Sequence, residues 1–124
     1  MDWPTRVAEV LANHPDDSLR ASVQNDLGIV YQEHPIGNRR ANLQRAIAAY
    51  SEALRFRPPD AAPLDYARTQ ANLGIVYEDL DDLPQAITCW REAARVAGDV
   101  GDEARAAKYT RWADDTQATL DAGG

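Results

Sequence analysis

The sequence has little of what most catalytic and metal sites are built from. Its 124 residues include one cysteine and two histidines. The lone Cys89 cannot form an internal disulfide, which agrees with a reducing compartment. His14 and His34 each precede a proline, where a loop is expected, and neither has a histidine or cysteine at a ligand spacing. We therefore expect no metal, no cofactor and no enzymatic activity, unless the fold gathers Asp, Tyr and His side chains in one pocket.

Positive charge is scarce as well. Thirteen basic residues stand against twenty acidic ones, for a formal net charge of −7. Such a field repels phosphate backbones and anionic lipid headgroups. No apolar run approaches the roughly 20 residues of a membrane-spanning helix, and the opening Met-Asp-Trp-Pro lacks the basic-then-apolar order of a signal peptide. We expect a cytoplasmic protein that binds neither nucleic acid nor membrane.

The acidic and sulfur-bearing residues that remain are explained by helix structure. The clusters at residues 16–17, 79–82 and 114–115 lack the order of a calcium loop. They suit helix starts and solvated faces, because carboxylates cap helices and stabilise the helix dipole. Cys89 lies beside Trp90 with no cationic neighbour, so a small packed side chain is expected there.

What the sequence does contain is a repeat. The block Leu-Gly-Ile-Val-Tyr occurs at residues 27–31 and again 46 residues later at 73–77. A second set of residues recurs after only 40 positions: Leu43, Ala46, Ile47, Tyr50, Glu52, Ala53 and Arg55 return as Leu83, Ala86, Ile87, Trp90, Glu92, Ala93 and Arg95. The first unit thus has six extra residues, which we place in a loop at residues 34–40.

Both segments of each unit read as helices, because their apolar residues recur at three- and four-residue spacings without an internal proline. Glycine and alanine then stand where two antiparallel helices would cross. A helical glycine costs about 1 kcal/mol relative to alanine, yet Gly28 is repeated as Gly74. This predicts a close helix contact in each unit, with Tyr50 or Trp90 filling the adjacent space.

These positions resemble the tetratricopeptide repeat (TPR) over roughly residues 16 to 98, and the long lead-in before the second block resembles a bacterial variant with a longer repeat. The matching residues are Leu27, Gly28, Tyr31, Ala46, Tyr50, Ala53 and Pro58 in the first unit and Leu73, Gly74, Tyr77, Ala86, Trp90 and Ala93 in the second. The departures are Gln24 and Gln70 in place of tryptophan, and Gly98 in place of proline. The resemblance implies an all-α fold of antiparallel helix pairs in a right-handed superhelical array.

We expect one domain over residues 1–124, with repeat 1 at about 16–60 and repeat 2 at about 61–100. A short helix at residues 4–12 would precede them, and an amphipathic capping helix at about 102–120 would follow. Trp90 and Trp112 are expected in the core, while the place of Trp3 stays open. The apolar stripe predicted for the capping helix consists of Tyr109, Trp112, Ala113, Thr116 and Leu120.

TPR folds present the first helix of each pair on a concave face that binds peptides or partner helices. By the resemblance, the binding residues would be Ser22, Asn25, Asp26, Ile29, Gln32, Glu33, Arg68, Ala71, Asn72, Ile75, Glu78 and Asp79. Ile29 and Ile75 stand where carboxylate-clamping members have asparagine, so that mode is disfavoured. An apolar stripe with acidic flanks suits a protein or peptide partner with basic flanks.

Two alternatives stay open at this point. Ile29 and Ile75 could pack against each other or against neighbouring helices instead of facing a ligand. The chain could also be a self-assembling, homo-oligomeric repeat fragment or an engineered repeat module with no separate ligand, since two repeats are near the minimum for a stable array.

Overall fold

The computed structural model describes residues 16–34 and 36–123 of the chain. Its five helices are α2 (Asp17–Glu33), α3 (Arg39–Phe56), α4 (Pro63–Asp79), α5 (Leu83–Asp99) and α6 (Glu103–Gly123), and this part of the chain has no strand. The expected all-α class is confirmed. The helix predicted at residues 4–12 lies outside the described residues, as do Trp3, His14 and Pro35.

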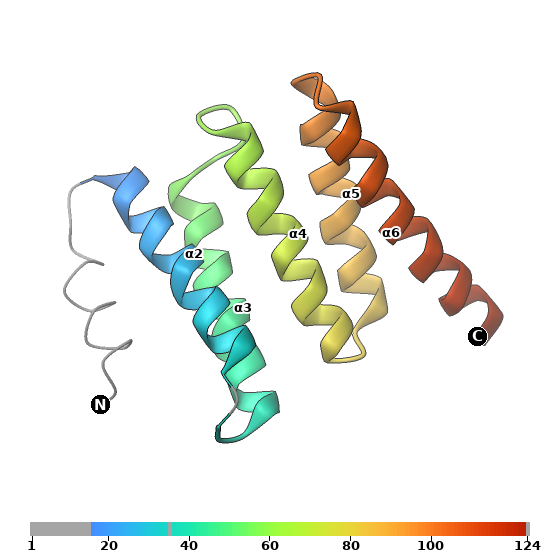
Figure 1. Ribbon diagram of the computed structural model, residues 1–124, viewed down its shortest axis with the longest axis horizontal. Helices are drawn as coiled ribbons and strands as arrows, with labels where there is room; N and C mark the ends of the chain where they lie inside the picture. Colours follow the sequence, from blue (N-terminus) through green and yellow to red (C-terminus); the bar gives the residue numbers. More distant parts are fainter. Residues whose placement is uncertain (1–15, 35, 124) are drawn as a thin grey trace.

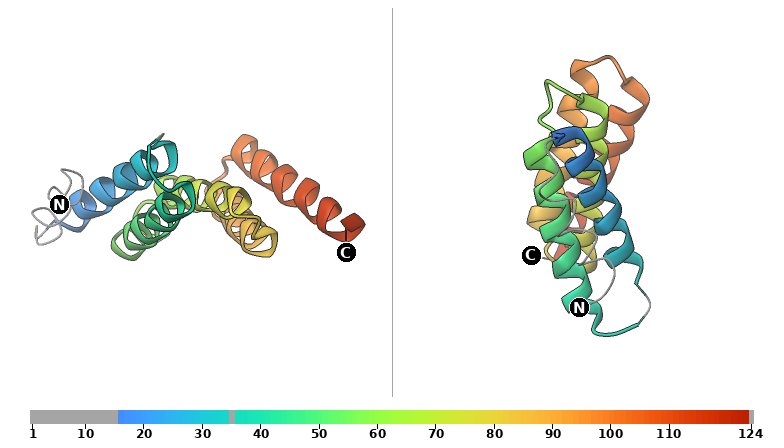
Figure 2. Two further views of the ribbon diagram at one scale, coloured as in Figure 1. Left: turned by 90° about the horizontal axis from the view of Figure 1, so that it is seen from below. Right: turned by 90° about the vertical axis from the view of Figure 1, so that its left-hand side faces the viewer.

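Successive helices run in opposite directions and lie side by side (Figure 1). Each packs mainly on its neighbours in the sequence, so that α2 contacts α3, α4 contacts α3 and α5, and α6 contacts α5. In the two views of Figure 2, α2, α4 and α6 lie toward one side of the array, with α3 and α5 toward the other. A single face is therefore built from alternate helices.

The helix starts follow the capping chemistry expected from the sequence. Asp16 accepts hydrogen bonds from the backbone N–H groups of the first turn of α2, Asn38 accepts one in α3, and Asp82 accepts one in α5. Helix α4 has no side-chain cap and begins instead with Pro63, whose missing N–H needs no partner in the first turn. The carboxylates at positions 16 and 82 thus serve helix termini, as predicted.

The six extra residues of the first unit are not all in a loop. Helix α3 begins at Arg39, whereas the residue that corresponds to the start of α5 is Leu43, so four of the six form an additional helical turn. The loop at residues 34–38 is only two residues longer than the loop at 80–82. Asn42 stabilises the new turn: it is buried, and its side-chain amide donates to the carbonyl of Ile36 at 3.0 Å. The prediction of a loop up to residue 40 is therefore corrected.

The doubled glycine does allow a close helix contact in both units. A Cβ atom on Gly28 would lie 2.5 Å from Cδ1 of Tyr50, and one on Gly74 would lie 2.5 Å from Nε1 of Trp90. The two rings are almost fully buried. Each aromatic ring therefore occupies the volume that a side chain at the glycine would need, as the repeat pattern predicts.

Helix α6 covers the outer side of α5 with the stripe expected for it. Tyr109, Ala113 and Thr116 are buried, and Trp112 and Leu120 pack half-buried against the core cluster that contains Trp90. The ring of Trp112 lies 5.7 Å from that of Trp90 in an edge-to-face arrangement. This contact brings the terminal helix next to the second helix pair.

Candidate functional site

The residues predicted to bind a partner lie on α2 and α4, but the structure divides them between two grooves and the core. We call the groove between α2 and α4 the polar groove; its lining residues are Ser22, Asn25, Asp26, Arg57, Asp65, Arg68 and Thr69. We call the groove between α4 and α6 the tryptophan groove; its lining residues are Ile75, Glu78, Trp90, Trp112, Asp115 and Thr116.

The polar groove is organised around Arg57, which follows the end of α3. Its guanidinium donates to the carbonyl of Ser18 at 2.8 Å and to the hydroxyl of Ser22 at 2.6 Å. It also lies 3.5 Å from a carboxylate oxygen of Asp65, and its side chain is only 16% exposed. One cation thus holds α2, α4 and the end of α3 together.

Most of the remaining polar groups of this groove also bond to one another, with the exposed Asp26 as the exception. The hydroxyl of Thr69 on α4 donates to the side-chain oxygen of Asn25 on α2 at 2.9 Å. Arg68 donates to Asp65 at 2.9 Å, one turn away on the same helix. A ligand would have to replace these bonds, so the polar groove is best explained as a structural link between the two helix pairs.

Sequence reasoning missed Arg57, Asp65 and Thr69 as members of this network. The spacing of Asp65 and Arg68 is a usable signal for a local ion pair. Nothing in the sequence distinguishes Arg57 from the other arginines, because its partners on α2 lie 35 and 39 residues away. Only the packing of the helices brings them together.

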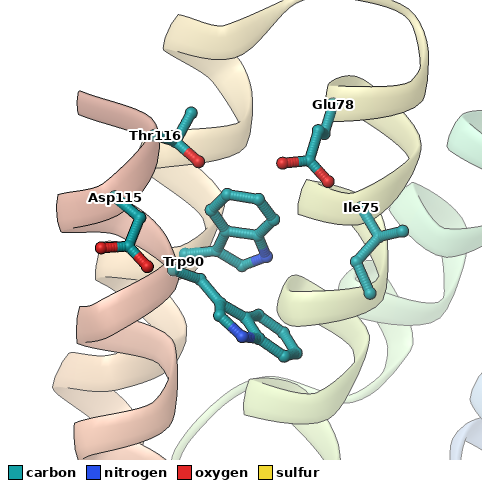
Figure 3. A pocket seen from close by; sticks show the side chains of 6 residues that line it. Ile75, Glu78, Trp90, Asp115 and Thr116 are labelled. Atoms are coloured by element: carbon teal, nitrogen blue, oxygen red, sulfur yellow. The ribbon is translucent and has the colours of Figure 1, made fainter. Parts of the chain in front are cut away.

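The tryptophan groove is of a different kind. It has a volume of about 370 Å³ and lies between side chains that α4 and α6 direct toward each other, with the indole of Trp90 between them (Figure 3). Trp90 is 2% exposed, and its Nε1 donates to the backbone carbonyl of Ala71 at 3.1 Å. The anchored ring gives the groove a rigid apolar floor.

Trp112 forms a second aromatic surface of this groove. It is half-buried, and its ring contacts Tyr109 at 5.6 Å between centroids. The ammonium of Lys108 lies 5.0 Å from the centre of the same ring, although Lys108 does not line the groove. The indole is therefore already placed in a cation–π contact on the surface of α6.

Two carboxylates stand at the rim, on opposite walls. Glu78 on α4 and Asp115 on α6 are both exposed, and neither side chain has an ion pair or hydrogen bond with a described residue. Their sequence neighbours differ in this respect: Asp79 pairs with Arg39 at 3.3 Å, and Asp114 pairs with Arg91 at 3.2 Å. The groove thus combines apolar walls with uncompensated negative charge.

The two isoleucines of the predicted stripe are both half-buried, which answers whether they are exposed. Ile29 packs against the cluster that contains Tyr50, whereas Ile75 packs against the cluster that contains Trp90 and lines the tryptophan groove. Of the two, Ile75 lines one of the two grooves defined above. The pair therefore supports two separate clusters instead of one groove, and α6 supplies the apolar surface next to Ile75.

Four further predicted residues have internal roles or lie away from both grooves. Ala71 is 3% exposed and belongs to the core, so its side chain is not available to a ligand. Gln32 accepts a hydrogen bond from the hydroxyl of Tyr50 at 2.7 Å. Glu33 is exposed and Asn72 half-buried, and neither lines the polar groove or the tryptophan groove.

Cys89 and His34 are both engaged in internal contacts. Cys89 is 6% exposed, and burial, with a smaller contribution from Asp82, raises the pKa of its thiol to about 11. His34 uses Nδ1 to accept from the backbone N–H of Ile36 at 3.2 Å. Residues 16–34 and 36–123 hold no group of three or more His, Cys, Asp or Glu that could bind a metal ion. Over the same ranges, no helix has the length and apolar character needed to cross a membrane.

Comparison of the chain with protein-family models, with curated proteins and with solved structures finds no match. The tetratricopeptide resemblance therefore rests on the repeated residues themselves.

Proposed function

We propose that this chain is a TPR-like protein-interaction module in which α2, α4 and α6 form the concave face of a right-handed superhelical array. Three features support this: the antiparallel helix pairs, the glycine-aromatic contact that occurs once in each pair, and a terminal helix over the last pair. In this proposal the concave face receives a peptide or a helix of a partner protein.

The tryptophan groove is the observation that carries the proposal. Binding sites for peptides are concave and largely apolar, with a few polar groups that orient the ligand. This groove has an anchored indole as its floor, Ile75 and Trp112 beside it, and two unpaired carboxylates at its rim. The polar groove offers less, because it has no aromatic surface and its charged groups other than Asp26 already pair with one another. We therefore place the centre of binding between α4 and α6.

The test is selection of peptides from a random display library on the full chain, followed by affinity measurement with synthetic copies of the selected peptides. Ile75→Arg should weaken binding by at least about tenfold, since the new side chain would occupy the groove and pair with its carboxylates. Val100→Arg makes the same change at a residue that is 47% exposed outside both grooves, and should leave affinity unchanged.

Circular dichroism and thermal unfolding will show whether Ile75→Arg retains the fold. If it does not, Glu78→Arg replaces it, because Glu78 is exposed at the rim, and its matched control is Asp60→Arg, at an exposed carboxylate between α3 and α4 outside both grooves. Full affinity in the folded groove variants, or a library that yields no binding peptide, would contradict the proposed function.

A further inference from the structure

We propose that the tryptophan groove binds the side chain of an arginine, with the guanidinium between Glu78 and Asp115 and against the exposed part of the Trp112 ring. This inference rests on the proposed function, and it names the chemistry that the partner must present at this groove. Two independent features favour arginine over other side chains: the carboxylates on opposite walls of the groove and the aromatic rings that line it.

The first reason is the arrangement of charge. Glu78 and Asp115 come from different helices and stand on opposite sides of the groove, and neither has a cationic partner in the described chain (Figure 3). A guanidinium carries five N–H donors in one plane, so a single group can donate to acceptors on two sides. Charge-assisted bonds of this type are about twice as strong as neutral ones.

The second reason is the aromatic floor. A guanidinium is planar and weakly hydrated, and it stacks on aromatic rings, whereas an ammonium is a compact and strongly hydrated charge. Trp90 and Trp112 provide the apolar surface, and hydrogen bonding to Ala71 and packing against Tyr109 hold the two rings in place. A lysine ammonium would have to lose more bound water than a guanidinium to enter this groove. This loss costs free energy, so we expect lysine to bind more weakly than arginine.

Several acidic residues of the described chain pair with arginine in this way. Asp79, Asp114, Glu92 and Asp102 each have an arginine within 3.3 Å. Glu78 and Asp115 have no such partner in the described chain, although each adjoins a paired aspartate in the sequence. An arginine from a partner would give them the contact that their neighbours make internally.

The experiment uses three blocked pentapeptides in which arginine, lysine or citrulline is flanked by two alanines on each side. Citrulline keeps the shape of arginine but lacks its charge. Titration into the full chain is followed by the indole N–H signals of Trp90 and Trp112 in two-dimensional NMR spectra. Both signals should shift, and the arginine peptide should bind about tenfold more tightly than the citrulline peptide, with lysine between them.

A matched pair of variants locates the effect. The double variant Glu78→Gln with Asp115→Asn should reduce binding of the arginine peptide to the level of the citrulline peptide. Asp114→Asn also removes one carboxylate from α6, but Asp114 pairs with Arg91 and does not line the groove, so affinity should be kept. Both changes affect exposed residues, and circular dichroism checks that the helices remain.

Equal affinity for arginine and citrulline, or an unchanged affinity in the double variant, would overturn the arginine proposal. If library-selected peptides lose binding in Ile75→Arg but do not depend on arginine, the proposal fails while the interaction function stands. If neither the library peptides nor the arginine pentapeptide bind, both fail.

Discussion

The two helix pairs have the same central contact but secure it in different ways. In α2 and α3 the ring of Tyr50 lies over Gly28, and its hydroxyl donates to the side chain of Gln32 at 2.7 Å. In α4 and α5 the ring of Trp90 lies over Gly74, and its Nε1 donates to a backbone carbonyl at 3.1 Å. The repeat preserves the shape of the contact, while the hydrogen-bond partner of the ring differs.

The surroundings of the two rings differ more. Trp90 has the ring of Trp112 on α6 beside it, at 5.7 Å, and a groove opens between α4 and α6. At the positions of Ile75 and Glu78, the first pair has Ile29, which packs on the cluster of Tyr50, and Gln32, which accepts a hydrogen bond from the Tyr50 hydroxyl. Equivalent positions in a repeat therefore acquire different roles from what packs outside them. Gln32 is bound to the ring of its own pair, whereas its counterpart Glu78 stands free at the rim of the tryptophan groove.

The largest loss of stability in both helix pairs should come from adding a methyl group at the two shared glycines. Gly28→Ala and Gly74→Ala should each lower the free energy of unfolding by about 1–3 kcal/mol, because neither buried ring can yield the required space. Gly98→Ala is the control, since its new Cβ would lie 3.9 Å from the nearest atom and should stabilise α5 by up to about 1 kcal/mol. Chemical denaturation measures all three. A neutral effect at positions 28 and 74 would show that the helices do not depend on this contact.

A smaller loss of stability should follow when the hydrogen bond of the ring in the first pair is removed. Tyr50→Phe removes the bond to Gln32 and should cost about 1 kcal/mol of the free energy of unfolding. Tyr77→Phe serves as the control, because the hydroxyl of Tyr77 makes no hydrogen bond with a described residue. Equal losses in the two variants would mean that the bond between Tyr50 and Gln32 contributes nothing specific.

A third effect is expected at alkaline pH, from the buried thiol of the second pair. Cys89 occupies the position of Ala49 in the first pair, and burial raises its pKa from 9.0 to about 11. Between these values the unfolded chain loses the thiol proton and the folded chain keeps it, so stability is full below pH 9 and falls as the pH rises toward 11.

The measurement is the free energy of unfolding of the parent chain and of Cys89→Ala across this pH range. The difference between them should shift in favour of the alanine variant as the pH rises. A difference that does not change with pH would indicate that Cys89 ionises equally in both states.

Much of the fold could be predicted from the sequence because its signals are local. The helical spacing predicts α2 to α5, the two glycine-aromatic pairs predict where helices cross, and the stripe from Tyr109 to Leu120 predicts the packing side of α6. The start of α3 was wrong, since Asn38 caps the helix and Asn42 bonds back to the loop, which places Arg39 and Arg40 in an added turn.

The binding face was harder to predict, because a groove is made by residues that are distant in the sequence. Ile75 and Glu78 were identified from their positions in the repeat, but Trp112 was assigned to the core alone and Asp115 to the solvated side of α6. Asp115 follows Glu78 by 37 residues, and no local pattern relates them. Glu78 and Asp115 share a groove because α4 and α6 both pack on α5.

The sequence by itself determined the helices, their order and the contact at each glycine, because these depend on hydrophobic periodicity and side-chain size within one unit. Only the tertiary structure decided which carboxylates pair with an arginine of another element and which of their neighbours stay free. Asp114 and Asp115 are adjacent in the chain, yet the helix rotation directs one to Arg91 and the other to the tryptophan groove. Charge pairing depends on distances between elements, and packing sets those distances.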